Sequence, residues 1–187
     1  MKDNMTNTRN QMLANKIING LESRNMSGCY VETKEEALKK ALELIPEGAS
    51  VGWGGAMSAQ QIGLMDAVNA GNYNAMDRDQ CATAQEREEM MRRHLFADVY
   101  ITGANGLSLD GQMVNIDGTG NRVAATIFGP KTVLVIAGMN KVEDTLDAAM
   151  IRARTVAAPI NQQRFMRDTP CSKTGTCGDC KSENCIC

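Results

Sequence analysis

Residues 115–122 (NIDGTGNR) hold the densest set of groups that could bind or transform a small molecule. A guanidinium binds a carboxylate or a phosphate through paired hydrogen bonds, and a carboxylate can transfer a proton or hold a hydroxyl group. A simple turn rarely needs so many functional groups, although Asp117 could merely cap the helix that follows. We therefore predict an anion-binding segment in which Arg122 neutralises charge and Asp117 acts in proton transfer or in orienting the substrate. The other expected ligand residues are Asn115, Gly118, Thr119, Gly120 and Asn121.

A second glycine-rich segment, residues 51–58 (VGWGGAMS), runs from an apolar strand pattern into the expected start of a helix. Glycine lets the backbone approach a ligand closely, and the N–H groups at a helix start attract an anion. The segment predicts a ligand site at Gly54, Gly55 and Ser58, and the alternative is a tight turn that needs small residues. It matches neither a P-loop nor a G-x-G-x-x-G fingerprint, so it indicates no nucleotide cofactor.

Two lysines bracket residues 132–137 (TVLVIA), an apolar run that predicts a buried strand. Lys141 follows the carboxyl end of this strand, where open α/β sheets bind ligands, and is the better candidate for a catalytic lysine. Lys131 precedes the strand and is expected at the opposite, solvated edge. The single histidine, His94, lies in a charged helix pattern, and we expect it to pack or to face solvent. The sequence offers no clear nucleophile–base pair.

Five of the seven cysteines fall within the last seventeen residues. In a reducing compartment such a cluster indicates metal binding rather than disulfides, and a tetrahedral zinc site needs four ligands. The spacing does not match a bacterial ferredoxin, so we rank zinc ahead of an iron–sulfur cluster, and both ahead of redox-active thiols. The predicted metal ligands come from Cys171, Cys177, Cys180, Cys185 and Cys187.

The length and charge of the chain narrow the class of protein. It has 187 residues, a net charge of -2 and no long basic run, which argues against a nucleic-acid binder. Its first residues are polar and unlike a signal peptide, and no apolar run is long enough to span a membrane. We predict a cytoplasmic protein that binds neither nucleic acid nor membrane, and an oligomer is compatible with the sequence.

The elements that must position these residues alternate between strands and helices. Near-continuous apolar strands, such as residues 98–102, are typical of a parallel sheet covered by helices on both faces, and we predict this α/β fold. An Asp110-Gly111 turn predicts a hairpin. We expect an α/β domain at residues 1–169 and a metal-binding tail at residues 170–187. Helix starts with capping boxes are predicted at Thr33–Glu36, Ser58–Gln61 and Thr83–Glu86.

Several motifs are spread over nearly the whole chain: VGWGGAMS at 51–58, GQMVNIDGTGNRVA at 111–124, FGPK at 128–131, AGMNKV at 137–142 and the Pro170-Cys171 tail. As a set they resemble the lactate-utilization (LUD) domain family, formerly domain of unknown function 162, and the VNIDGTGNRVA stretch is the most specific of them. Relatives commonly have Ser-Met-Thr after the Gly-Gly pair, where this chain has Ala56-Met57-Ser58. One potential hydroxyl ligand is therefore missing.

The resemblance implies a sheet similar to that of the ribose-5-phosphate isomerase, glucosamine-6-phosphate deaminase and CoA-transferase superfamily. Some LUD proteins take part in oxidising lactate to pyruvate beside iron–sulfur oxidoreductase partners. The first hypothesis is a protein that binds a small anionic metabolite, either a hydroxy or keto acid or a sugar phosphate. It would act as an isomerase- or transferase-like enzyme or as a subunit of a lactate-oxidising system. The alternative is a non-catalytic accessory or electron-transfer subunit with a metal-binding cysteine tail.

Overall fold

The structure, a computed structural model, describes residues 2–185 and 187. Its contacts divide the chain into two compact units that are each built from separated segments. Unit one comprises Met1–Tyr30, Ala104–Gly118 and Gly138–Cys187, and unit two comprises Val31–Gly103 and Thr119–Ala137. None of these divisions coincides with the predicted domain boundary after residue 169.

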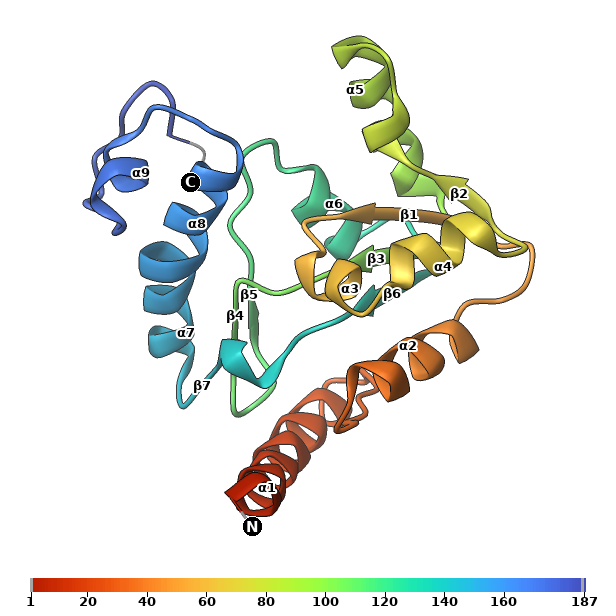
Figure 1. Ribbon diagram of the computed structural model, residues 1–187, viewed down its shortest axis with the longest axis vertical. Helices are drawn as coiled ribbons and strands as arrows, with labels where there is room; N and C mark the ends of the chain where they lie inside the picture. Colours follow the sequence, from red (N-terminus) through yellow and green to blue (C-terminus); the bar gives the residue numbers. More distant parts are fainter. Residues whose placement is uncertain (1, 186) are drawn as a thin grey trace. The chain divides into compact units, whose positions relative to one another are not determined.

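Unit two is built on a four-stranded parallel sheet with the strand order β2-β1-β3-β6 (Figure 1). Helices flank this sheet, which confirms the predicted α/β fold. The strands are β1 (Ser50–Gly54), β2 (Asn74–Met76), β3 (Val99–Thr102) and β6 (Thr132–Val135). The helices are α2 (Lys34–Glu43), α3 (Met57–Gln61), α4 (Leu64–Ala70), α5 (Ala84–Arg93) and α6 (Asn121–Ile127), with short 3-10 turns η1 (Arg78–Gln80) and η2 (His94–Phe96).

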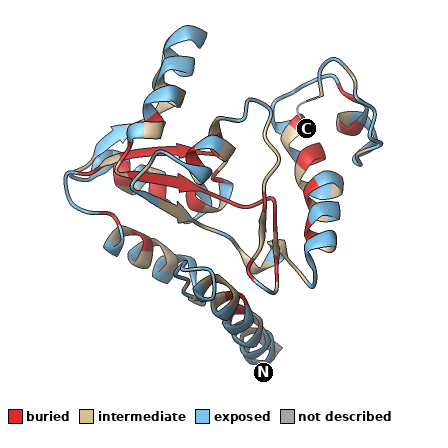
Figure 2. Ribbon diagram, turned by 180° about the vertical axis from the view of Figure 1, so that it is seen from behind, coloured by how far each residue is buried: buried red, intermediate tan, exposed pale blue. Residues whose placement is uncertain are grey.

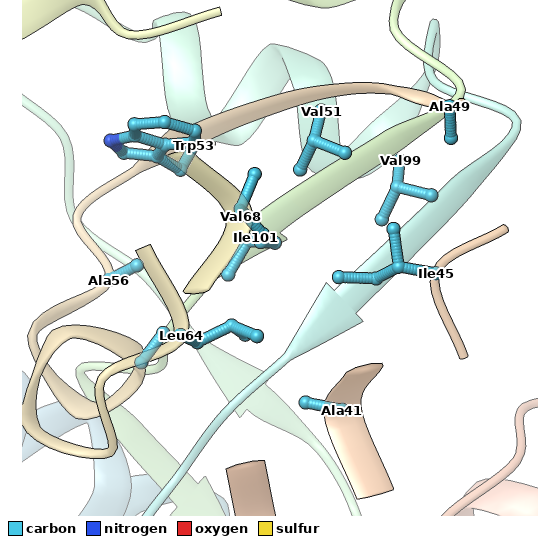
Figure 3. Packing of buried hydrophobic residues seen from close by; sticks show 11 residues of the cluster. Ala41, Ile45, Ala49, Val51, Trp53, Ala56, Leu64, Val68, Val99 and Ile101 are labelled. Carbon is cyan, nitrogen blue, oxygen red and sulfur yellow. The ribbon is translucent and has the colours of Figure 1, made fainter. Parts of the chain in front are cut away.

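One face of this sheet carries the hydrophobic core of unit two (Figure 3). Successive side chains of a strand point to opposite faces, so every second residue of β1 and β3 faces this core. The register pairs Val51 with Val99 and Trp53 with Ile101, which places these four side chains side by side. Buried residues of the covering helices and loops complete the cluster, and removing them all from water is the main favourable term in folding. They include Ala41, Ile45, Ala56, Leu64 and Val68.

The opposite face of the sheet is lined by glycines and polar groups. A Cβ atom on Gly52 would lie 2.7 Å from Cδ2 of His94, so only glycine leaves room for the imidazole. A Cβ atom on Gly54 would clash with the hydroxyl group of Tyr100. His94 is 1% exposed, and its Nε2 donates to the carbonyl oxygen of Met76 at 2.8 Å. Of the two expectations for this histidine, packing is therefore the correct one.

The amino edge of the same sheet is held by one carboxylate. Asp98 accepts hydrogen bonds from the backbone and hydroxyl groups of Ser50 at 2.9 and 2.7 Å. Lys131 donates to the other oxygen of Asp98 at 2.7 Å. The Lys131 ammonium, followed by the Ser50 donors, holds the pKa of Asp98 well below its usual range. These contacts join the starts of β1, β3 and β6, and they place Lys131 at the edge where it was predicted.

Unit one contains a three-stranded sheet with the order β5-β4-β7. Strands β4 (Gly106–Ser108) and β5 (Met113–Val114) form the predicted hairpin, and β7 (Val142–Glu143) pairs with β4 in parallel. Its helices are α1 (Lys2–Glu22), α7 (Leu146–Arg152), α8 (Ala158–Arg164) and α9 (Pro170–Thr174), with the 3-10 turn η3 (Met139–Lys141) and the π-helical turn η4 (Ala153–Ala157). Among the described residues, no helix combines the length and apolar character needed to cross a membrane.

Two glycines let backbone segments of unit one touch directly. A Cβ atom on Gly106 in β4 would lie 2.5 Å from the carbonyl oxygen of Ala149 in α7. Gly111 in the hairpin turn has a φ of +83°, and a Cβ atom there would lie 3.0 Å from the carbonyl oxygen of Ile17 in α1. Arg24 fastens the same contact, because its Nη1 donates to the carbonyl oxygen of Asp110 at 2.6 Å.

Two details of the sequence prediction are wrong. The run at residues 132–137 does form a strand, but β6 lies at the edge of the sheet and its ends, Thr132 and Val135, are exposed. The predicted capping box at Ser58–Gln61 does not form, because α3 begins at Met57 and Ala56 occupies its N-cap without a side-chain hydrogen bond. By contrast, the boxes that begin at Thr33 and Thr83 are both present.

The buried His94 makes stability depend on pH. Burial lowers the pKa of His94 below its ordinary value of 6.5; the Met76 carbonyl opposes this effect, and Arg78 adds to it. As the pH falls, the unfolded chain therefore binds a proton before the folded chain does. The contribution of the neutral imidazole to the free energy of unfolding is complete above the ordinary histidine pKa of about 6.5. It is lost as the pH falls from there towards the pKa of His94 in the folded chain.

We expect the free energy of unfolding of the wild-type chain to fall on acidification from about pH 7 to about pH 5, with a slope of up to about 1.4 kcal/mol per pH unit. A His94→Gln variant should be less stable at neutral pH and should show a flatter profile. Urea unfolding at a series of pH values measures both. Since the chain has one histidine, the difference in slope isolates this residue. Identical slopes would contradict the assignment.

Candidate functional site

The turn at Gly54 and Gly55 lies at the carboxyl end of the parallel sheet. Strand β1 ends at Gly54, and Gly55 follows it with a φ of +59°, a conformation that favours glycine. The Thr102 hydroxyl, at the end of the neighbouring β3, donates to the carbonyl oxygen of Gly54 at 2.9 Å. This hydrogen bond holds the turn beside the end of β3. Ligands of open parallel sheets bind at this edge.

Arg122 brings a guanidinium group onto this turn from α6. A Cβ atom on Gly55 would lie 2.9 Å from both Cδ and Nη1 of Arg122, so the arginine side chain rests against the glycine backbone. Arg122 is only 5% exposed. The two glycine-rich segments that the sequence analysis treated separately therefore meet at Gly55 and Arg122 within unit two.

A second guanidinium, that of Arg78, lies beside the same turn and was missed by the sequence analysis. A Cβ atom on Gly54 would lie 3.7 Å from Nη1 of Arg78. The Nε atom of Arg78 is buried and has no hydrogen-bond partner among the described residues. Arg78 begins η1 only two residues after β2 ends, so it occupies the same edge of the sheet as Gly54. The signal in the sequence that could have identified Arg78 was an arginine directly after a short strand pattern.

The carboxylates that neighbour Arg78 in sequence are engaged elsewhere. Asp77 accepts hydrogen bonds from the backbone of Asp79 at 2.9 Å and from the side chain of Gln80 at 3.1 Å. Asp79 forms an ion pair with Arg87 at 2.8 Å. We refer to Gly54, Gly55, Arg78, Thr102 and Arg122 together as the glycine-turn site. Two of its five residues are permanently cationic.

Ser58, the third ligand residue predicted in this segment, is half-buried in α3. Because α3 starts directly after the turn, Ser58 lies only three residues beyond Gly55, near the carboxyl edge of the sheet. Its hydroxyl group does not cap the helix, so the structure gives it no role in ending the strand or starting α3. A ligand role for Ser58 therefore stays a prediction.

The predicted ligand segment at residues 115–122 is divided between the two units, with the division after Gly118. In unit one, Asn115 has a structural role, since its Oδ1 accepts from the backbone of Asn105 at 3.1 Å. Asp117 is half-buried, and the N-cap of α6 is Gly120 with a φ of +82°. In unit two, Thr119 is exposed and Asn121 is the first residue of α6. Of the residues in unit two, Arg122 is the one that the structure places against Gly55.

Lys141 also belongs to unit one, where it ends the 3-10 turn η3 and is half-buried. Its backbone N–H donates to the carbonyl oxygen of Gly138 at 3.0 Å. It follows β6 in the chain, but it does not belong to the compact unit that contains the glycine-turn site. Its catalytic role therefore remains a prediction from the sequence.

An open hollow of about 700 Å³ also lies in unit one, and none of the predicted ligand residues lines it. It is framed by α1, the Asp110–Gly111 hairpin turn and the start of α7. We place the candidate site at the glycine turn instead, because the buried Arg122 and the half-buried Arg78 lie there, whereas Lys16 in this hollow is exposed. The residues lining the hollow are Lys16, Asn19, Gly20, Leu109, Asp110, Gln112, Asp144, Thr145 and Leu146.

The cysteine tail follows α8 in unit one. Cys171 is buried in α9, with its thiol 3.3 Å from the Thr169 hydroxyl, whereas the exposed Cys180 donates to Ser182 at 3.6 Å. Cys187 is exposed as a residue, but its thiol is partly removed from water. This removal, reinforced by the thiols of Cys185, Cys177 and Cys171, raises the pKa of Cys187 to about 11. In the described part of the chain, no three His, Cys, Asp or Glu side chains are arranged to hold a metal ion.

Comparisons with known proteins place the chain in a family. One solved structure that it resembles is ribose 5 phosphate isomerase A from Neisseria gonorrhoeae, at 20% sequence identity and a TM-score of 0.39. The match covers 60% of this chain and 54% of the isomerase, so the chain spans about half of that protein's length. Among curated proteins, none matches the chain. The model of the LUD domain matches residues 14–187, nearly the whole chain, and the protein therefore belongs to the LUD domain family, which is associated with lactate utilization.

Proposed function

We propose that the protein binds a small anionic metabolite, a hydroxy or keto acid or a sugar phosphate, at the glycine-turn site. The observation that carries this proposal is the buried guanidinium of Arg122 resting on Gly55, with Arg78 beside the adjacent Gly54. A guanidinium offers a planar set of donors that matches the oxygen pairs of a carboxylate or a phosphate. The association of the family with lactate utilization favours the hydroxy and keto acids within this class.

Each residue of the glycine-turn site, together with the neighbouring Ser58, has a separate part in this proposal. Arg122 and Arg78 supply positive charge and directed N–H donors, and the burial of Arg122 strengthens its electrostatic attraction relative to solvent. The absence of side chains at Gly54 and Gly55 lets the ligand approach the backbone closely. The hydroxyl of Ser58 adds a hydrogen bond. Thr102 positions the turn through the carbonyl of Gly54 rather than by touching the ligand.

The proposed reaction residues are Asp117, for proton transfer or for orienting a ligand hydroxyl, and Lys141, for charge neutralisation. Both belong to unit one, and their assignment rests on the sequence pattern. With them the protein would be an isomerase- or transferase-like enzyme or a subunit of an oxidoreductase. Without them it would be a binding subunit.

Thermal-shift titration with lactate, pyruvate, ribose 5-phosphate and inorganic phosphate tests the binding proposal, because a ligand that binds only the folded state raises the melting temperature. We expect the ligand that stabilises the wild-type chain to bind Arg122→Gln and Arg78→Gln about 10- to 100-fold more weakly, the loss expected for hydrogen bonds to a charged group. Lys40→Gln, on the exposed surface of α2, is the matched control and should bind normally. Unchanged binding by both arginine variants would contradict the site.

Replacing Asp117 by Asn separates binding from chemistry. The variant should keep the ligand-induced thermal shift while turnover of that ligand falls by about 100-fold or more, the usual size of a general acid–base contribution. Turnover is followed by product formation or, for a reversible proton transfer, by exchange of the ligand's proton with heavy water. If both binding and turnover match the wild type, Asp117 has no catalytic role.

We propose separately that the cysteine tail binds a metal ion, with zinc ahead of an iron–sulfur cluster. Five thiols in seventeen residues exceed the four ligands of a structural zinc site. The thiols of Cys185, Cys177 and Cys171 each raise the pKa of Cys187, while Cys180 donates to Ser182. Binding would deprotonate the thiols and draw them together, and metal binding commonly couples to local folding in this way.

Metal analysis of protein purified with and without oxygen tests the tail proposal. We expect about one zinc per chain, as for a single four-ligand site. The zinc should be lost from Cys171→Ser and Cys185→Ser but retained by the controls Cys29→Ser and Cys81→Ser, which lie outside the tail. Iron with acid-labile sulfide would favour the accessory electron-transfer function instead. Protein without metal under both conditions would remove the metal proposal.

A further inference from the structure

An exposed apolar patch lies on unit two, away from the hydrophobic core. It is formed by Phe96, Ile127 and Phe128, whose exposed fractions are 85%, 77% and 86%. These two phenylalanines are two of only three in the chain. A solvent-facing cluster of large apolar side chains is typical of an interaction surface.

The three residues come from two segments that run side by side. A Cβ atom on Gly129 would lie 2.5 Å from the carbonyl oxygen of Leu95, and the backbone N–H of Lys131 donates to the carbonyl oxygen of Ala97 at 3.2 Å. Phe96 lies between these two contacts on one segment, and Phe128 directly precedes them on the other. The three exposed residues therefore lie on adjoining segments, in η2 and at the end of α6.

Helix α5 leads directly into this patch and buries none of its own residues. It extends away from the sheet in Figure 1, and it is coloured mostly as exposed in Figure 2. A helix of ten residues is barely stable in water without tertiary packing. Its local support is the capping box at Thr83 and the ion pair of Glu88 with Arg92 at 2.6 Å. A partner that packs against it would supply the burial that it lacks.

An acidic residue, a basic residue and the aromatic patch follow one another along α5 and the η2 turn after it. Glu89 and Arg93 are four residues apart, which places them on the same side of α5, and Phe96 follows three residues later at the end of η2. Glu88 and Arg87 form ion pairs within the chain. In contrast, no ion pair in the described part of the chain involves Glu89 or Arg93.

We propose that two copies of the chain associate through this face, with their α5 helices antiparallel. A two-fold axis between the levels of Glu89 and Arg93 brings Glu89 of each copy to Arg93 of the other. It also covers Phe96 with the first turn of the other copy's helix, which begins at Ala84. A parallel arrangement would place like charges together. The order of charges is thus complementary to itself under two-fold rotation, and this favours a second copy over an unrelated partner.

Sedimentation equilibrium of the full-length chain tests the proposal. We expect a dimer whose dissociation constant rises at least about tenfold in Glu89→Arg and in Arg93→Glu, since each reversal turns two symmetric attractions into repulsions. Phe96→Ser should weaken the dimer as well. The matched control is the charge swap Lys40→Glu with Glu43→Lys on α2, which exchanges an exposed ion pair elsewhere in unit two and should leave the dimer unchanged.

Two complementary samples make the test specific for the antiparallel arrangement. An equal mixture of Glu89→Arg and Arg93→Glu chains should form a heterodimer, and the double variant with both changes should recover the homodimer, because opposite charges then face each other again. Circular dichroism and thermal melting confirm that each variant is folded. A monomer at all concentrations, or a dimer that ignores both reversals, overturns the proposal. Failure of the mixture and the double variant to recover association overturns it too. Ligand titration of the same chains reports on the glycine-turn site independently.

Discussion

Glycines at the end of β1 have no side chains, and this leaves room at the sheet for polar groups of unit two. A strand normally presents side chains to both of its faces, and here Gly52 and Gly54 present none to the second face. His94 and Tyr100 occupy that space, and Arg122 lies against Gly55 just beyond the strand. A methyl group at any of these glycines would displace a neighbour that is itself packed. The contact between glycine backbone and polar side chain is the constraint on which the candidate site depends.

A ligand site and a tight turn that needs small residues are therefore compatible interpretations of the glycine-rich segment. Gly52 and Gly54 are needed for packing, because His94 and Tyr100 approach them closely. Gly55 is needed for its left-handed backbone and for the approach of Arg122. The groups that approach include a guanidinium and a phenol rather than aliphatic side chains, so tight packing itself concentrates hydrogen-bonding groups at the carboxyl edge of the sheet. A ligand would complete an arrangement that the fold already maintains.

The parts of the fold that depend on residues close together in the sequence could be predicted. The apolar runs located β1, β3 and β6, and the boxes at Thr33 and Thr83 located two helix starts because their hydrogen bonds span only three residues. The exposure of β6 could not be predicted, since an apolar run does not reveal which strand lies at an edge. Arg78 was missed for a related reason: its importance comes from the pairing of the three-residue β2 with β1, a contact between distant segments. The division of residues 115–122 between two units depends on contacts of the same kind.

The contact of Gly106 with the carbonyl of Ala149 has a bearing on how mutational data for this protein should be interpreted. Main-chain atoms from β4 and α7 meet there with no adjustable side chain between them, so even the smallest side chain forces the strand and the helix apart. In a saturation-mutagenesis survey, position 106 would stand out as intolerant because of this packing alone. Intolerance of this kind reflects the shape of the scaffold, and it has to be set aside before sensitive positions are assigned to chemistry.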